Sequence, residues 1–507
     1  MKAHLMHRQR DFDLSQSLPS NKESLTQDLE LSTLFNAMAR GDKFLLQVAQ
    51  QAVLSGLQDE PEVDTILYRQ AVLEDCLRYY PIVKSIYDIA GQAFENKNRG
   101  WLGVFGTLPS SILYSAVELL QMLVGVLGKL ERVADEHGDE FESEGFRTFF
   151  AMLKSELADD YFAAVKRHLE ELKFHRGVLV SAELGKGNGG TRFVLCHAAA
   201  QKKSGWIDQV FGRKPPGYTY HLHPRDDAGA RALGDLRSRG INSVANAAAQ
   251  SADHVLSFFT MLRTELAFYL GCVNLHGELL NRRVPVCFPV PTPPGTRRHA
   301  VVGLRDACLA LRLEQGVVGN DFGADGKNLV VITGANQGGK STLLRAVGLA
   351  QLMMQSGMFV AAESFSADVC RSLFTHYKRE EDVTMKSGKF DEELARMSEI
   401  VKALTPDSIV LFNESFAATN EREGSEIARQ IVRALLEKRV KVFFVTHLYE
   451  FARGLWEEKK DDALFLRAER QDDGTRTFKV LPGEPLQTSF GGDLYHDIFE
   501  SAALGGK

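Results

Sequence analysis

The chain has few cysteines, and their spacing gives them no recognisable chemical role. Six cysteines are spread over 507 residues without a C-x-x-C pair, which argues against a zinc site, a redox site and a disulfide framework. We therefore expect free, buried thiols in a reducing cytoplasm. They are Cys76, Cys196, Cys272, Cys287, Cys308 and Cys370.

Long apolar runs are also missing. Residues 1–16 contain none, so the N-terminus does not resemble a signal peptide. The most apolar region, residues 101–130, is interrupted by Pro109, two serines and Glu118, which leaves segments shorter than the ~20 residues that cross a bilayer. This region is predicted to form a buried core helix. Membrane association is the alternative, and no stable membrane insertion is expected.

Neither charge sign dominates the composition. The 60 Lys and Arg nearly balance the 66 Asp and Glu, so no global basic field indicates nucleic-acid binding. Residues 176–240 are biased locally, with eleven basic against five acidic side chains. This bias fits either a nucleic-acid surface or an ordinary solvated one.

The spacing of apolar residues divides the chain into distinct parts. After a tail at residues 1–23, helical spacing covers 24–175 and returns at 241–290, while β-like runs between Gly- and Pro-rich turns occupy 176–240. A Pro-rich linker spans residues 284–299, and residues 291–507 alternate apolar runs with helical segments. We expect a multidomain protein in which an all-α domain with a small β-rich insertion precedes an α/β domain with a mostly parallel sheet.

The segment "GANQGGKST" matches the P-loop pattern and lies between an apolar run and a helical one. Glycines let backbone N–H groups approach phosphates, the lysine neutralises them, and the serine hydroxyl can ligate Mg²⁺. The predicted nucleotide-binding residues are Gly334, Ala335, Asn336, Gln337, Gly338, Gly339, Lys340, Ser341 and Thr342. No helical segment follows a second Gly-rich stretch, 185–190, and β-like runs flank it, which favours a hairpin loop.

Residues 409–414 have the form of a Walker B strand, with four apolar residues before a polar pair. The usual pair is an Asp that holds the Mg²⁺ shell and a Glu that polarises the attacking water. Asn413 stands at the Asp position and offers an uncharged oxygen, so we expect weaker metal binding, while Glu414 is retained. His447 ends the next apolar run and is predicted to contact the γ-phosphate.

These segments resemble the MutS family of DNA mismatch-repair ATPases. The P-loop matches the family's Asn and double Gly, with Gln337 where methionine is common, and residues 414–424 align without gaps with its Walker B motif and following loop. "FFVTHLYEFA" is similar to the family's switch segment, which contains His447. Other matches are Thr419, Gly424, Asn320, Asp321 and Ser387, whereas Gly388 and Lys389 depart from the signature motif.

The resemblance implies an ABC-type ATPase domain that uses ATP and Mg²⁺, with Ser341 and Asn413 near the metal and with Glu414 and His447 catalytic. It also implies a homodimer in which Ser387 and Gly388 complete the partner's site. The helical part resembles the family's lever, and the β-rich insertion stands where the family has a DNA clamp. Candidate DNA contacts are Lys186, Arg192, Lys202, Lys203, Arg213 and Lys214.

The expected function is that of a dimeric clamp on duplex or branched DNA, with slow ATP hydrolysis, in DNA repair or recombination control. The family's mismatch-reading and connector domains are not expected, nor is a C-terminal nuclease domain, so classical mismatch reading is not expected either. The expected location is the cytoplasm, with association with the nucleoid if the source is bacterial.

Two alternatives remain open. A transporter-type ABC subunit would carry an LSGGQ signature, which the sequence lacks. A nucleotide-gated scaffold with little or no hydrolysis, acting on RNA or a ribonucleoprotein, follows if Asn413 abolishes Mg²⁺ use. The retained Glu414 and His447 favour hydrolysis over the scaffold.

Overall fold

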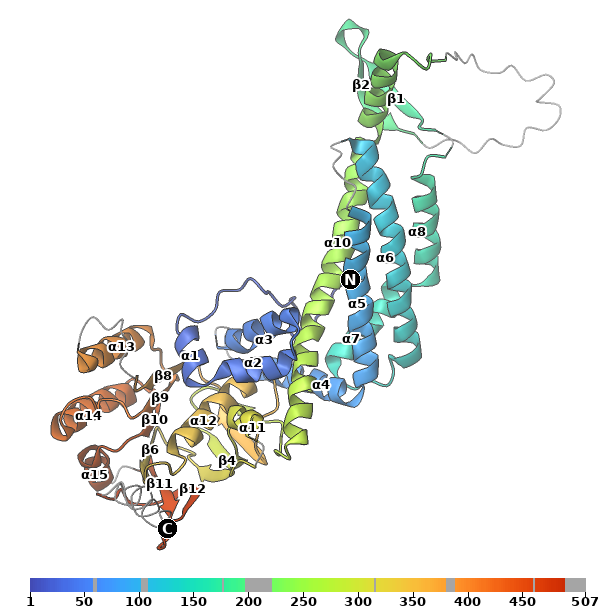
Figure 1. Ribbon diagram of the computed structural model, residues 1–507. Coiled ribbons are helices and arrows are strands. Elements are labelled where there is room, and N and C mark those ends of the chain that lie inside the picture. The colour runs from blue at the N-terminus through green and yellow to red at the C-terminus, as the bar shows by residue number, and fades with distance from the viewer. Residues whose placement is uncertain are drawn as a thin grey trace, which may run out of the picture. The chain divides into compact units, whose positions relative to one another are not determined.

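The computed structural model describes residues 1–57, 62–101, 108–175, 177–196, 221–313, 316–379, 388–458 and 461–487. The chain forms two compact units, each assembled from separate segments (Figure 1). The first unit contains residues 1–3, 84–140 and 148–263, and the second contains residues 4–83, 141–147 and 264–507. The domain boundaries expected from the sequence stay predictions, except where the helix and strand bounds given below contradict them.

The first unit is built mainly from long helices. Pro109 begins α6 instead of interrupting it, because proline is well tolerated in the first turn of a helix. Leu113 and Leu120 of α6 pack with Leu169 of α8 and Ile241 of α10 in one core. The helices are α5 (Tyr80–Trp101), α6 (Pro109–His137), α7 (Glu144–Glu156), α8 (Asp159–Glu171) and α10 (Asp227–Asn281), of which α5, α7 and α10 cross into the second unit.

Two helices, α6 and α10, are long and apolar enough to cross a membrane by length and composition alone. In α6, only 39% of the most apolar window is buried, against 72% in α10. The region predicted as a buried core helix is therefore only partly buried, because α6 packs along one face and leaves Tyr114 65% exposed.

A β-hairpin closes one end of the first unit. Strands β1 (Val180–Leu184) and β2 (Gly190–Leu195) pair antiparallel around a short 3₁₀ turn, which confirms the hairpin predicted at the second Gly-rich stretch. The extension of the β-rich region to residue 240 was wrong, because α10 already begins at Asp227. Asp226 caps that helix by accepting the backbone N–H of Gly229 at 2.8 Å. Gly240, the last residue of that predicted region, lies inside the helix, where a Cβ would sit 2.4 Å from Cγ2 of Val180.

The N-terminal tail packs into the second unit. The buried carboxylate of Glu265 in α10 accepts backbone N–H groups from Leu5 at 2.6 Å, Met6 at 3.3 Å and Phe12 at 2.9 Å. Short helices follow this segment along the chain: α1 (Lys22–Asp28), α2 (Leu31–Ala39), α3 (Lys43–Ser55) and α4 (Val63–Arg78).

The second unit contains two sheets. The first has the strand order β12-β11-β6-β10-β9-β8, and every neighbouring pair is parallel except β11 with β12, which confirms the mostly parallel sheet. Its strands are β6 (Leu329–Gly334), β8 (Leu373–Tyr377), β9 (Ile409–Asn413), β10 (Lys441–Val445), β11 (Ala463–Arg470) and β12 (Arg476–Pro482).

The second sheet has the order β3-β7-β4-β5 and corrects the predicted Pro-rich linker. That segment contains β3 (Val290–Thr292) and the start of β4 (His299–Leu304), which both pair with β7 (Ser364–Asp368), while β5 (Asn320–Gly323) pairs with β4. Its prolines are compatible with pairing because β3 is an edge strand.

Helices cover both faces of the six-stranded sheet (Figure 1). Phe412 faces a core shared with α14 and α15, whereas the next residue back, Leu411, faces Gly348 of α12, since successive side chains of a strand point to opposite faces. The helices are α11 (Ala307–Arg312), α12 (Lys340–Gln355), α13 (Lys389–Ala403), α14 (Glu421–Glu437) and α15 (Tyr449–Glu457).

Candidate nucleotide site

The P-loop joins β6 to α12 at the carboxyl end of the sheet. Gly334 and Gly339 have φ values of 112° and 87°, in the region that favours glycine. A Cβ on Gly334 would lie 2.8 Å from the backbone nitrogen of Ala468 in β11. The loop therefore needs glycine both for its turn and for its close packing against the neighbouring strand.

Lys340 is buried at the start of α12 and is held by the loop itself. Its Nζ donates to the backbone carbonyls of Gly334 at 3.0 Å and Ala335 at 2.8 Å. Burial lowers the pKa of Lys340 to about 8. Within the described part of the chain, the ammonium thus donates hydrogen bonds to neutral acceptors, and an arriving phosphate would give it a full countercharge.

Ser341 and Asn413 meet across the sheet edge. The Ser341 hydroxyl donates to Asn413 Oδ1 at 2.8 Å, so the two oxygens lie close enough to share one cation. A hydroxyl and an amide carbonyl are oxygen ligands of the kind that Mg²⁺ accepts, although neither carries charge. The arrangement fits a Mg²⁺ ion that is held mainly by nucleotide phosphates.

Glu414 and His447 touch one another. They follow the adjacent parallel strands β9 and β10, and His447 Nε2 lies 3.0 Å from Glu414 Oε1. Since an ionised carboxylate only accepts, Nε2 is the donor. This hydrogen bond lowers the pKa of Glu414, which keeps the carboxylate ionised and able to accept a proton or a water hydrogen.

The loop after Glu414 is fixed by β8. The Ser415 hydroxyl lies 2.6 Å from the backbone oxygen of His376 and 2.7 Å from its ring Nδ1, and His376 Nε2 bonds the carbonyl of Glu393 in α13 at 3.0 Å. Burial lowers the pKa of His376 to about 4. This contact links α13 to the residue beside Glu414, a connection that no sequence motif indicates.

A cavity of about 440 Å³ joins these groups. P-loop residues, Glu414 and His447 line it, and so does a group of apolar side chains. The sequence interpretation missed the apolar wall. It consists of Leu309, Leu313, Val317, Val318 and Phe478.

Phe478 reaches this wall from β12. Asn320, the first residue of β5, links β5 to β12. Its side-chain amide donates to the Phe478 carbonyl at 3.3 Å and accepts the N–H of Val480 at 2.7 Å. The Asn320–Asp321 pair was the one sequence signal near this wall, and no motif marks Phe478. Its ring is 49% exposed, which leaves a face for a ligand.

The remaining candidate residues either are not among the lining residues of this cavity or lie outside the described residues. Gly388 is the N-cap residue of α13, and Ser387 lies outside the described residues. Lys186 is exposed in the hairpin turn, and Arg192 forms an ion pair with Glu183 at 3.3 Å. The other candidate DNA contacts also lie outside the described residues: Lys202, Lys203, Arg213 and Lys214.

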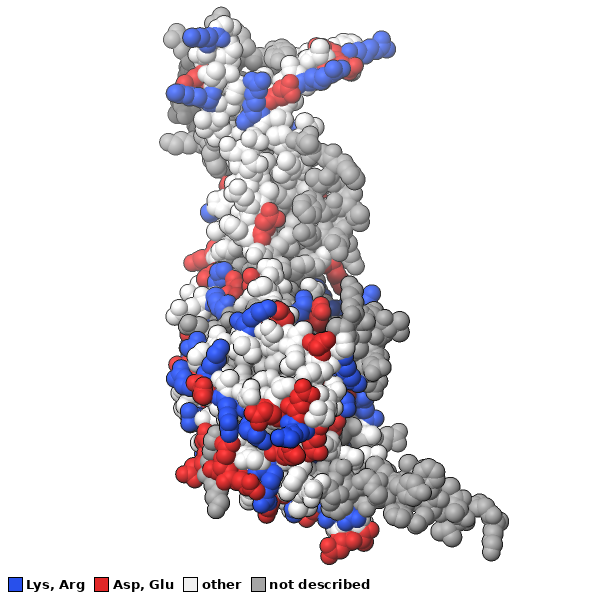
Figure 2. All heavy atoms as spheres, turned by 90° about the vertical axis from the view of Figure 1, so that its left-hand side faces the viewer, with Lys and Arg blue, Asp and Glu red and all other residues white. Residues whose placement is uncertain are grey.

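The hairpin end of the first unit carries charges of both signs, with basic ones in excess. Residues 177–196 and 221–240 contain six Lys and Arg and four Asp and Glu, some of which are visible at the top of Figure 2. The flank below them in that view is mostly uncharged. In this view, the basic side chains of the first unit gather at its hairpin end.

Two family models match the chain. The model of the MutS2 N-terminal domain matches residues 61–282, and the model of MutS domain V matches residues 330–494. The second match contains the P-loop, the end of β9 and His447.

Curated relatives match over shorter stretches. Endonuclease MutS2 of Thermus thermophilus is 38% identical over 132 residues, which are 26% of this chain and 18% of the relative. MutS protein homolog 4 of Mus musculus is 31% identical over 156 residues (31% and 16%), and DNA mismatch repair protein MutS of Thermotoga maritima is 38% identical over 140 residues (27% and 18%). The chain thus matches less than a fifth of the length of each of these relatives. Because the two family models together cover most of the chain, and the relatives carry the same family name, the chain belongs to the MutS family.

Proposed function

We propose that the chain binds ATP with Mg²⁺ in the 440 Å³ cavity and hydrolyses it slowly, as the nucleotide switch of a dimeric DNA clamp. One observation carries this proposal. Lys340, Ser341, Glu414 and His447 line one cavity that also has the apolar wall, and Asn413 contacts Ser341 beside it. Membership of the MutS family and the names of the relatives, among them a DNA mismatch repair protein, support the DNA partner and the setting in DNA repair or recombination.

The apolar wall can bind the nucleobase of ATP, and the P-loop can bind its phosphates. The Phe478 ring and the valine and leucine side chains offer a flat and an aliphatic surface, which favour stacking of a purine. Backbone N–H groups of the loop and the Lys340 ammonium hold the β- and γ-phosphates. Ser341 and Asn413 would hold Mg²⁺ together with the phosphates, and the ion would supply charge neutralisation at the transferred phosphoryl group.

Glu414 orients and polarises the attacking water beyond the γ-phosphate. Its ionised oxygen accepts a hydrogen from that water, while His447 holds the carboxylate in place and presents its ring to the γ-phosphate oxygens. Asn413 limits this chemistry, since a neutral amide holds the metal less firmly than a carboxylate. Slow turnover follows from the combination of an intact water-polarising pair and a weakened metal contact.

The alternative is a scaffold that binds ATP without turnover, acting on RNA or a ribonucleoprotein, and one feature of the structure favours it. The Asn413 carbonyl oxygen is neutral and already accepts the Ser341 hydroxyl at 2.8 Å, so it offers a metal one remaining lone pair and no charge. Steady-state hydrolysis separates the two functions, because both bind ATP and only one turns it over.

The test measures ATP hydrolysis against Mg²⁺ concentration, with and without duplex and branched DNA, for the wild type, Glu414→Gln and Asn413→Asp. We expect kcat to fall about 100-fold or more in Glu414→Gln and the Mg²⁺ requirement of Asn413→Asp to drop several-fold. A wild-type rate equal to that of Glu414→Gln, with ATP still bound, would contradict hydrolysis and leave the scaffold. A rate that DNA does not change would contradict coupling to DNA.

A further inference from the structure

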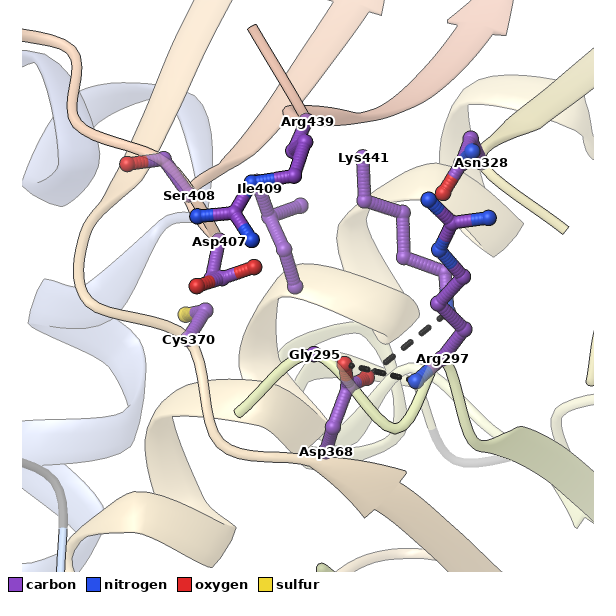
Figure 3. Close-up of a pocket in the computed structure, with 10 residues that line it drawn as sticks. All are labelled: Gly295, Arg297, Asn328, Asp368, Cys370, Asp407, Ser408, Ile409, Arg439 and Lys441. Atoms are coloured by element: carbon purple, nitrogen blue, oxygen red, sulfur yellow. Dashed lines mark hydrogen bonds and ion pairs between the residues drawn. The ribbon is translucent and has the colours of Figure 1, made fainter. Parts of the chain in front are cut away.

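A second cavity, of about 170 Å³, lies at the amino end of the six-stranded sheet (Figure 3). Its walls come from the residues that precede or begin β6, β9 and β10, from the turn between β3 and β4, and from the end of β7. The P-loop is at the opposite edge of the same sheet, because it follows the carboxyl end of β6. The two cavities share no lining residue.

Three cations line this cavity: Arg297, Arg439 and Lys441. Neither guanidinium makes a hydrogen bond or an ion pair with any part of the chain that the structure describes. Lys441 is only 7% exposed, and its Nζ has no hydrogen-bond partner among the described residues, although Asp368 Oδ1 lies 3.8 Å away. Burying an ammonium without hydrogen bonds is costly, and among the described residues Asp368 is the carboxylate that offsets this charge at ion-pair distance.

Arg439 stands where a helix end normally selects glycine. The N–H groups of Arg439 and Val440 bond the carbonyls of Leu436 at 2.9 Å and Leu435 at 3.0 Å, which forms a Schellman motif after α14. Arg439 occupies its left-handed position with φ 61°, and Arg297 and Asp407 also have positive φ values, of 58° and 63°. An arginine at such a position has a backbone cost, so its side chain has to contribute something that glycine cannot.

Two carboxylates also line the cavity, and they differ in their partners. Asp368 is engaged by Lys441 and by the backbone N–H of Arg297 at 3.2 Å. The Asp407 carboxylate accepts no hydrogen bond from a described residue, and Figure 3 shows it on the same side of the cavity as the Arg439 guanidinium. A free carboxylate repels a fully ionised anion but accepts a hydrogen bond from a protonated one.

From this combination we propose that the cavity binds a phosphate group that retains a proton, as inorganic phosphate or a phosphomonoester. Arg297 and Arg439 hold the ionised oxygens, which planar guanidinium groups do well, and Asp407 accepts the P–OH hydrogen. Inorganic phosphate keeps at least one proton at neutral pH, whereas a phosphomonoester keeps one mainly at or below about pH 6, where its second ionisation occurs, so its binding should strengthen as the pH falls to that value. Sulfate and a phosphodiester carry no such proton, so Asp407 discriminates against both.

The test is calorimetric titration of inorganic phosphate into protein saturated with ADP and Mg²⁺, which occupies the P-loop. We expect saturable binding of phosphate. Sulfate should bind at least about tenfold more weakly under the same conditions, because it carries no proton that Asp407 could accept as a hydrogen bond. Arg439→Gly should weaken phosphate binding about tenfold or more while leaving the thermal midpoint unchanged or higher, since glycine suits the Schellman position. Asp407→Asn, which also tolerates positive φ, should reduce the preference for phosphate over sulfate.

The matched control is Lys438→Ala, which removes the neighbouring exposed cation that does not line the cavity. Phosphate binding that disappears when ADP is present, that Arg439→Gly leaves unchanged, or that sulfate equals would overturn the proposal. Thymidine 5′-monophosphate and a dinucleotide phosphodiester identify the source of the phosphate. Binding of the monoester assigns the site to phosphomonoesters, binding of phosphate alone assigns it to the free ion, and equal binding of the diester contradicts the part given to Asp407.

Discussion

Two buried lysines at opposite edges of one sheet have different surroundings. Lys340 donates to two backbone carbonyls of the P-loop, whereas Lys441 lacks a hydrogen bond among the described residues and lies 3.8 Å from a carboxylate. Burial is the main cause that lowers the pKa of each. The comparison shows that burial alone does not define a lysine's function. The difference lies in the groups near each ammonium. Lys340 has neutral carbonyl acceptors and can still bind a phosphate, whereas Lys441 lies near the carboxylate of Asp368 and offsets its charge.

The largest effect is expected from Lys340→Met. The change removes the charge that meets the phosphates, so ATP affinity should fall about 100-fold, which corresponds to about 2.7 kcal/mol. Stability should change by no more than about 1 kcal/mol, because the lost carbonyl bonds are offset by no longer burying an ammonium. Equilibrium binding of a fluorescent ATP analogue and urea unfolding measure the two quantities. Unchanged affinity would show that Lys340 does not contact the nucleotide.

The pH dependence of ATP binding gives the next largest effect. In the nucleotide-free protein the pKa of Lys340 is about 8, and bound phosphates favour its charged form. Above pH 8 the lysine must take up a proton on binding, so the dissociation constant should rise up to about tenfold per pH unit, while below pH 7 this group contributes no slope. Calorimetry in two buffers of different ionisation enthalpy should detect uptake of about half a proton at pH 8. Binding without proton uptake there would contradict a nucleotide contact through this lysine.

The P-loop edge was predictable from sequence because its information is local. The glycine spacing around Lys340 and the apolar runs of β6, β9 and β10 are each contained within a few residues. Glu414 and His447 follow the carboxyl ends of β9 and β10. Because these strands are parallel neighbours, their carboxyl ends lie side by side, which also makes this contact predictable. The start of α10 was missed because residues 227–240 contain Gly234 and Gly240 and are mostly exposed in the helix, so they carry little apolar spacing that would indicate it.

The cavity at the amino end of the sheet was not predictable, because none of its residues belongs to a sequence motif. Arg297, Asp407 and Arg439 lie in three separate turns, and only the strand order β6-β10-β9 and the fold of the second sheet place them around one cavity. Nor does the sequence reveal the left-handed backbone of Arg439, which depends on where α14 ends. Phe478 was also not predicted from sequence, because its position near the P-loop depends on the pairing of β12 with β11 and not on a local motif.

The smallest effect, and the one that completes the comparison, is expected from Lys441→Met. This change leaves Asp368 without its cation, and burial already raises the pKa of that carboxyl group, so unfolding free energy should fall by about 1 to 3 kcal/mol. Asp368→Asn added to Lys441→Met should recover most of the loss, because it removes the charge left behind, and the double-mutant cycle measures the coupling. ATP affinity should stay at the wild-type value in both variants, opposite to Lys340→Met. Should Lys441→Met instead stabilise the protein, the ion pair with Asp368 would not be what holds this lysine in the interior.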